Sequence, residues 1–153
     1  MIAYRLCKTK YAATALSGYG AKEYGGRWNS RGVSLVYLSG SIALATLEVM
    51  VHVPNQNLLS DLYSILPLEF PKTACENLDP NALPNHWTDY PAPDDLQQIG
   101  NQWVEFGSTP LLRIPSAIIP SEFNYLFNPN HNNAAFIQPL EPREFYFDSR
   151  LTT

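Results

Sequence analysis

Residues 33–52 read VSLVYLSGSIALATLEVMVH, and this stretch decides the kind of fold that the chain can adopt. Residues 33–38 are rich in β-branched and apolar side chains, which is typical of a buried strand. Ser39 or Ser41 can then cap a helix that runs from about residue 42 to residue 52. The stretch therefore predicts a strand that leads directly into a helix.

Glu48 lies in the middle of this predicted helix. Residues 42–53 are apolar nearly all round, which predicts a buried helix, and an unpaired carboxylate inside it would be costly. Glu48 is either a structural acid, paired with an arginine or capped by backbone amides, or a catalytic carboxylate. His52 follows on the same helical face, but a metal site needs further ligands. His86 and His131 lie far off in loop-like sequence, so we expect no metal and a structural His52.

Short strands and few helices are expected outside this unit, because 13 prolines divide the chain. Residues 3–7 and 62–70 read as strands, and residues 111–114, 123–127 and 145–147 are further strand candidates. Residues 8–29 contain four glycines and read as a loop or a short helix. These elements predict one α+β domain over residues 1–153, with a curved mixed sheet and flanking helices.

The second half of the chain contains one more predicted helix. It starts at Asp94 or Asp95 and stops at Gly107, with Leu96, Ile99, Trp103 and Phe106 at helical spacing on one packed face. Before it, residues 70–93 hold five of the prolines and read as a long surface excursion.

Composition limits the classes of function. The 153 residues are 45% hydrophobic and 16% charged, which predicts one compact core. With 10 Lys and Arg against 14 Asp and Glu, the net charge of -4 argues against direct nucleic-acid binding, whereas a small phosphorylated ligand needs only one or two arginines. We find no signal sequence and no membrane span, so a cytoplasmic protein is expected, with Cys7 and Cys75 as buried free thiols.

Arg27 lies in a glycine-rich loop, residues 24–29, with the sequence YGGRWN. Two glycines let the backbone approach a ligand, and the guanidinium offers a planar fork to phosphate. The alternative is a Gly-Gly turn whose surface arginine stacks on Trp28.

Ser116 is the one hydroxyl in the apolar stretch 114–120, and Asn124, Asn128 and His131 follow it closely. Such groups can fix the orientation of a ligand. No Gly-x-Ser-x-Gly motif surrounds Ser116, so we read it as a binding hydroxyl rather than a nucleophile. For the asparagines, the alternative is a role in turns.

Six short motifs, taken together and in this order, resemble the RES-domain family over nearly the whole chain. They are residues 25–30 (GGRWNS), 36–39 (VYLS), 47–48 (LE) with 51–52 (VH), 112–116 (LRIPS), 124–129 (NYLFNP) with His131, and 147–151 (FDSRL). The Arg, Glu and Ser that give the family its name match Arg27, Glu48 and Ser116, and the pocket tyrosine of the family matches Tyr37.

The resemblance implies a toxin that consumes NAD by hydrolysis or phosphorolysis, on a fold related to ADP-ribosyltransferases. NAD is then the substrate, and no cofactor is expected. Some members are thought to modify a protein instead, and a binding module that senses a dinucleotide without turnover is a third reading. The resemblance also implies a helix-turn-helix antitoxin of the Xre type, which binds the operon DNA itself. A homodimer or a larger toxin–antitoxin complex is compatible with this reading.

Within such a site, each matched residue has an expected role. Glu48 would stabilise the positive charge that develops on ribose, and Arg27 would bind the pyrophosphate. Tyr37 could stack on a ring, while Ser116 hydrogen-bonds ribose or phosphate and Asn124 contacts substrate. Arg5 is a second basic candidate, with a structural ion pair as its alternative.

Overall fold

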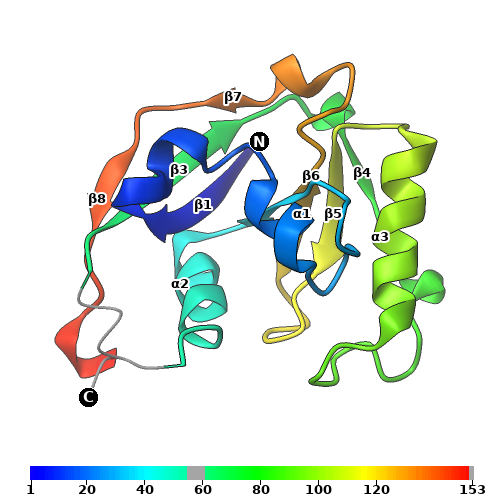
Figure 1. The fold of residues 1–153 in the computed structure, drawn as a ribbon, viewed down its shortest axis with the longest axis horizontal. Coiled ribbons are helices and arrows are strands. Elements are labelled where there is room, and N and C mark those ends of the chain that lie inside the picture. The colour runs from blue at the N-terminus through cyan, green and yellow to red at the C-terminus, as the bar shows by residue number, and fades with distance from the viewer. Residues whose placement is uncertain (55–60, 152–153) are drawn as a thin grey trace.

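The structure, a computed structural model that describes residues 1–54 and 61–151, has one curled sheet with helices packed against it (Figure 1). The strand order is β4-β5-β6-β2-β1-β3-β7, and β8 pairs with β3. The strands are β1 (Ile2–Lys8), β2 (Val36–Ser39), β3 (Tyr63–Glu69), β4 (Cys75–Asn77), β5 (Leu111–Pro115), β6 (Phe123–Phe127), β7 (Gln138–Pro139) and β8 (Arg143–Phe145). The helices are α1 (Tyr19–Tyr24), α2 (Ile42–Met50) and α3 (Asp94–Phe106), with short 3-10 turns between elements.

The sheet is mixed, because β4 and β5 are parallel while the other paired strands are antiparallel. This confirms the predicted α+β class with a curved mixed sheet and flanking helices. No helix in residues 1–54 and 61–151 has the length and hydropathy needed to span a membrane.

The two halves of the sheet meet at a narrow joint. β1 pairs with β3 along its whole length, from Ile2 to Lys8, but it pairs with β2 only where Tyr4 faces Ser39. Beyond that pair, the Arg5 side chain, in place of a backbone N–H of β1, donates a hydrogen bond from Nη1 to the carbonyl oxygen of Tyr37 at 3.0 Å. The strands therefore diverge at Arg5, and the sheet curls there.

Helix α2 begins as predicted at Ser41, whose hydroxyl accepts a hydrogen bond from the Leu44 N–H at 3.1 Å. Ala45 packs with Leu6 of β1 in one of the three core clusters. The expectation of burial on every side was wrong, because Leu47 is 38% exposed and Val51 is 60% exposed. The sheet covers only one side of α2.

Helix α3 has the predicted bounds, Asp94 to Phe106, and Leu96 and Trp103 are buried against β5 and β6. Phe106 does not share that face, contrary to expectation, and is 84% exposed. At 100° per residue, Phe106 stands about 80° from Leu96 around the helix axis, which is outside the packed stripe.

Two further expectations need correction. The segment 70–93 is not a continuous surface excursion, because it contains β4, which pairs with the start of β5. Residues 78–93 of this segment connect β4 to α3 and form what we call the strap. The strand expected at residues 145–147 lies at Arg143–Phe145, and Phe147 instead packs edge-on against Tyr63, with 5.0 Å between ring centroids.

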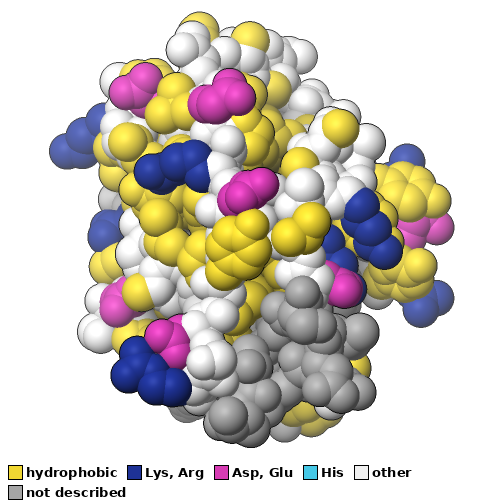
Figure 2. Space-filling model, turned by 90° about the vertical axis from the view of Figure 1, so that its left-hand side faces the viewer, with side chains coloured by type: hydrophobic (Ala, Val, Ile, Leu, Met, Phe, Trp, Pro, Cys, Tyr) yellow, Lys and Arg dark blue, Asp and Glu magenta, His cyan; other side chains and the backbone are white. Residues whose placement is uncertain are grey.

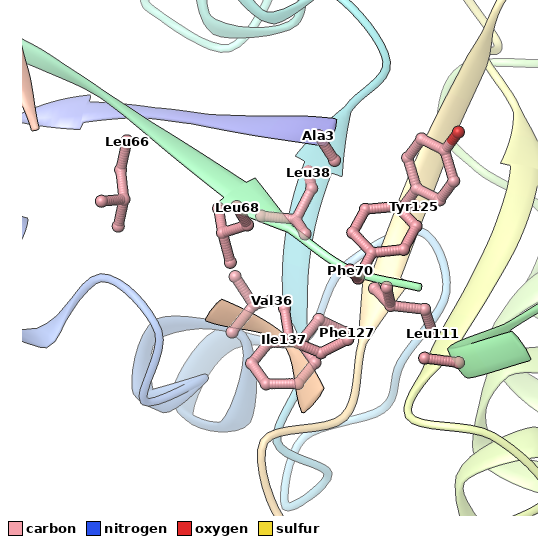
Figure 3. Packing of buried hydrophobic residues seen from close by; sticks show 11 residues of the cluster. Ala3, Val36, Leu38, Leu66, Leu68, Phe70, Leu111, Tyr125, Phe127 and Ile137 are labelled. Carbon is pink, nitrogen blue, oxygen red and sulfur yellow. The ribbon is translucent and has the colours of Figure 1, made fainter. Parts of the chain in front are cut away.

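The largest core cluster covers one face of the sheet (Figure 3). It takes alternate residues of the strands, including Val36 and Leu38 of β2 and Tyr125 and Phe127 of β6. Because side chains alternate along a strand, Tyr37, Ser39, Asn124 and Leu126 point to the opposite face. That opposite face carries α2, α3 and the polar residues singled out above.

On the side of the molecule shown in Figure 2, positive and negative side chains are interspersed among hydrophobic ones.

Cys7 and Cys75 are free and half-buried, and burial raises the pKa of the Cys75 thiol to about 11.

Candidate functional site

Glu48 is held by two other segments of the chain. One of its oxygens, Oε1, accepts a hydrogen bond from the Ser116 hydroxyl at 2.9 Å and another from Nδ2 of Asn124 at 2.5 Å. Glu48 comes from α2, Ser116 directly follows β5, and Asn124 lies on β6. Three of the predicted site residues are thus brought together at one end of the sheet.

Ser116 is fully buried, and its hydroxyl has no bonding capacity left. Besides donating to Glu48, the oxygen accepts hydrogen bonds from the N–H groups of Ile118 at 3.1 Å and Ile119 at 3.2 Å. A hydroxyl has one proton and two lone pairs, and all three are used. This geometry makes Ser116 a support for Glu48, and the ligand contact that we expected from the sequence stays a prediction.

The second oxygen of Glu48, Oε2, differs from the first. Among the described residues, Oε2 receives no hydrogen bond, and no Lys or Arg lies within ion-pair distance of the half-buried carboxylate. The structural alternative, an acid paired with an arginine or capped by backbone amides, does not describe this site. Glu48 is fixed through one oxygen and open at the other.

Tyr37 organises the loop that carries Arg27. Its hydroxyl donates to Oδ1 of Asn29 at 2.7 Å and accepts from the N–H of Trp28 at 3.0 Å. A Cβ on Gly26 would lie 2.6 Å from this hydroxyl oxygen, so the close approach requires glycine. Burial raises the pKa of Tyr37, which keeps the phenol protonated as a donor.

Asn29 holds the same loop from inside. It is fully buried, and the two N–H groups of its Nδ2 donate to the backbone oxygens of Ala21 at 2.8 Å and Val33 at 3.0 Å, with one of them shared with the Ser30 oxygen at 3.2 Å. Because every polar group of this side chain is paired, the loop is anchored without the help of solvent.

Helix α3 supports the loop from the outside, a role that the sequence analysis missed. Gln97 donates to the carbonyl of Gly26 at 2.9 Å, and Asn101 both accepts from the N–H of Ser30 and donates to its hydroxyl. Between them, Gly100 is packed so closely that a Cβ there would lie 1.8 Å from the Trp28 carbonyl oxygen. The sequence signal was the small Gly100 and the polar Gln97 and Asn101, which lie within five positions beside the apolar stripe of the helix.

Arg27 itself reaches the strap. Its Nη1 donates to the carbonyl oxygen of Trp87 at 2.9 Å, and its Nη2 donates to that of Asp89 at 3.1 Å. The alternative of a surface arginine stacked on Trp28 does not hold: the Trp28 side chain is buried in a core cluster, and the cation–ring contacts found among the described residues do not include this pair.

The loop of Arg27 and the carboxylate of Glu48 lie on the same face of the sheet. Tyr37, which holds the loop, pairs with Leu126, and Ser39, two residues further, pairs with Asn124, which holds Glu48. Two residues along a strand correspond to about 7 Å. The residues that hold the Arg27 loop and those that hold Glu48 are therefore neighbours on β2 and β6.

Arg5 lies under the same strand. Its guanidinium contacts the backbone of Tyr37, burial lowers its pKa, and its Nε is buried without a partner among the described residues. The ion pair considered as its structural alternative is absent from residues 1–54 and 61–151.

Other predicted polar residues form hydrogen bonds with the backbone. Nδ1 of His52 donates to the Glu48 carbonyl at 2.7 Å, and His131 bonds the carbonyl of Gly107 at 2.9 Å. Asn128 accepts from the N–H of Asn130, which is the turn role considered for it. No group of three or more His, Cys, Asp or Glu side chains suited to a metal occurs in the described ranges.

Two cavities lie away from Glu48. One, of about 700 Å³, lies between the strap and the β5–β6 hairpin, with Trp87, Pro115 and Phe123 among its walls. Another, of about 390 Å³, lies near Met1 and Phe136. In the described part of the chain, neither is lined by Glu48 or Arg27.

Comparison with known proteins relates this arrangement to a family. Residues 2–148 match the RES domain. A protein named Toxin Res from Yersinia enterocolitica is 37% identical over 152 residues, which covers 99% of both chains. A protein named Prs ADP-ribosylating toxin from Sphingobium is 40% identical over 144 residues, with 92% of this chain and 89% of the relative covered.

The fold also matches a solved structure, the MbcT–MbcA toxin–antitoxin complex of M. tuberculosis. The TM-score is 0.78 at 18% identity, with 95% of this chain and 84% of the solved chain covered. With the match over residues 2–148 and full-length relatives that are named toxins, the chain belongs to the RES domain family of toxins.

Proposed function

We propose that this chain is the toxin of a toxin–antitoxin pair and that it cleaves the bond between nicotinamide and ribose in NAD. The observation that carries the proposal is the state of Glu48, whose carboxylate is held through Oε1 by Ser116 and Asn124 while Oε2 accepts no hydrogen bond from the described residues. A carboxylate that is held through one oxygen, so that the other can face a ligand, is suited to stabilising a positive charge that develops in a bound substrate.

The departure of nicotinamide leaves positive charge spread over the ribose ring. In the proposed mechanism, the free oxygen of Glu48 faces the anomeric carbon and stabilises this oxocarbenium-like state. Water or phosphate then attacks the carbon, which gives free nicotinamide and ADP-ribose or its phosphorylated form. Glu48 acts by its charge, through the ribose hydroxyls or as a base on the attacking molecule.

The other predicted site residues divide into contacts and supports. Arg27 binds the pyrophosphate, and Arg5 is a second cation for the same ligand. Tyr37 offers its ring for stacking while its hydroxyl keeps the Arg27 loop in place. Ser116 and Asn124 fix Glu48, and the position of Asn124 beside this carboxylate supports its expected contact with substrate.

Incubating the purified chain with NAD tests the reaction class. Free nicotinamide without modified protein, in buffers with and without phosphate, is the expected result, and the identity of the second product tells hydrolysis from phosphorolysis. NAD that remains intact under both conditions would contradict the proposal and leave a transferase that lacks its acceptor, or a dinucleotide-binding module.

A transferase that moves ADP-ribose to a protein is the second candidate, and the name of the Sphingobium relative favours it. The acceptor would then be a protein side chain in place of water or phosphate. Isotope-labelled NAD added with a cell extract distinguishes the two, because only a transferase leaves label on protein.

The proposed partner is an antitoxin of the Xre type that covers the site and binds DNA, so this chain itself need not touch DNA. The fold match to a chain of a toxin–antitoxin complex supports a partner of this kind.

The proposal implies action in the cytoplasm, where NAD is available. Expression alone should stop bacterial growth and deplete NAD, and co-expression of an adjacent antitoxin gene should restore growth. Arrested cells with normal NAD would contradict this.

A further inference from the structure

The strap, residues 78–93, is joined to the candidate site through Arg27. It is the proline-rich segment to which the sequence motifs assigned no role, and most of it is exposed. Its backbone nevertheless follows defined turns, in which the N–H of Trp87 bonds the carbonyl of Pro84 at 3.1 Å and the N–H of Asp89 bonds that of His86 at 3.0 Å. These turns aim the carbonyls of Trp87 and Asp89 at the guanidinium.

A count of donors shows what this contact leaves free. A guanidinium has five N–H donors in one plane. The strap takes one from Nη1 and one from Nη2 of Arg27, so Nε–H and one N–H on each terminal nitrogen remain. These three remaining donors can bind the oxygens of a phosphate. The strap therefore fixes the plane of the fork without filling it.

Trp87 ties the strap to the body of the protein together with Leu78 and Leu83, and it is the one of the three whose own carbonyl accepts from Arg27. It is half-buried and packs against the core cluster under α3 that also contains Trp28. His86 and Asp89, on either side of it in sequence, are exposed. The position of the two carbonyls that hold Arg27 therefore depends on Trp87.

We propose that the strap is a positioning element of the site, with Trp87 as its anchor, and that it presents Arg27 to the phosphates of a dinucleotide. The inference rests on the proposed function for the identity of the substrate. Trp87 does not contact the substrate in this proposal. It acts on Arg27 through its own backbone carbonyl and that of Asp89.

The test compares Trp87→Ala with Trp87→Phe and with the neighbouring control His86→Ala. If the guanidinium loses its fixed plane, the KM for NAD should rise about tenfold, which corresponds to roughly 1.4 kcal/mol, while kcat stays within about twofold. Trp87→Phe should recover most of the affinity because an aromatic anchor is restored. His86→Ala, with an exposed side chain, should match the parent chain.

Inorganic pyrophosphate serves as a second probe that does not depend on turnover. Its Kd, measured by titration calorimetry, should weaken about tenfold in Trp87→Ala and not in His86→Ala. Were Trp87→Ala too unstable, Pro84→Gly would loosen the same turn from outside the core, with the same expected weakening.

The outcomes separate the strap from the reaction. A chain that releases no nicotinamide but loses pyrophosphate affinity on Trp87→Ala would refute NAD cleavage and leave the strap proposal standing. An unchanged KM and Kd in Trp87→Ala would overturn the strap proposal, and so would a lowered KM, since it would mean that the strap competes with the phosphates for Arg27.

Discussion

The Arg27 loop and the Glu48 carboxylate lie on one face of the sheet, yet they are held in opposite ways. Around the loop, Asn29 and the Tyr37 hydroxyl have every polar group paired inside the protein. At Glu48, one carboxylate oxygen and the Oδ1 of Asn124 have no partner among the described residues. Fully paired buried groups stabilise a scaffold, whereas incompletely paired ones are poised to bind something else.

The comparison predicts its largest effect on stability at Asn29. Replacing Asn29 by Ala removes the donor to the Val33 carbonyl, the acceptor of the Tyr37 hydroxyl proton and one of the two bonds to the Ala21 carbonyl, and we expect a loss of about 3 kcal/mol in the free energy of unfolding. For a domain of this size, that corresponds to a fall of roughly 6–12 °C in Tm. Thermal melting measures it, with the exposed Asn85→Ala as the control. Equal melting temperatures would mean that the loop is not anchored as described.

A smaller effect on stability, joined to one on turnover, is expected at Ser116. Ser116→Ala removes the donor to Glu48 and the acceptor for two backbone N–H groups, which should cost about 1–2 kcal/mol of stability. Since Glu48 also loses its alignment, kcat should fall about tenfold while the KM for NAD stays close to the parent value. A changed KM with an unchanged kcat would return Ser116 to the ligand-contact role that the sequence suggested.

The smallest effect is expected at Arg27, where replacement by Lys keeps the charge and loses the planar fork. The KM for NAD should rise about fivefold, or roughly 1 kcal/mol, with little change in kcat. Steady-state kinetics of nicotinamide release measure both constants. Kinetics identical to the parent would confine Arg27 to its bonds with the strap.

Much of the fold follows from local pattern. The strand-to-helix unit, the Ser41 cap and the bounds of α3 were predictable because they depend on periodicity and capping within a few residues. β4 was not, because three residues with two polar side chains carry no strand pattern and pair only with a distant partner, β5. The exposure of Leu47 and Phe106 also depends on which side the sheet covers.

The candidate site shows the same difference between local features, which were predictable, and contacts between distant residues, which were not. Motifs singled out Arg27, Glu48, Ser116, Tyr37 and Asn124, but their mutual contacts span long distances in sequence. Ser116 and Glu48 are 68 residues apart, and Arg27 and Trp87 are 60 apart. Residue types alone could not show that Ser116 spends its hydroxyl on Glu48, or that the strap supplies the carbonyls for Arg27.

The most direct test of the account measures NAD turnover and thermal melting on the same sample of Glu48→Gln. The amide has nearly the size of the acid and can still accept from Ser116 and Asn124 through its oxygen. No described cation pairs with Glu48, so the account predicts a stability within about 1 kcal/mol of the parent and a kcat lower by about a hundredfold or more. If Glu48 were a structural acid, its replacement by Gln would instead lower the free energy of unfolding by about 3–5 kcal/mol. A folded Glu48→Gln chain that cleaves NAD at the parent rate would contradict the account.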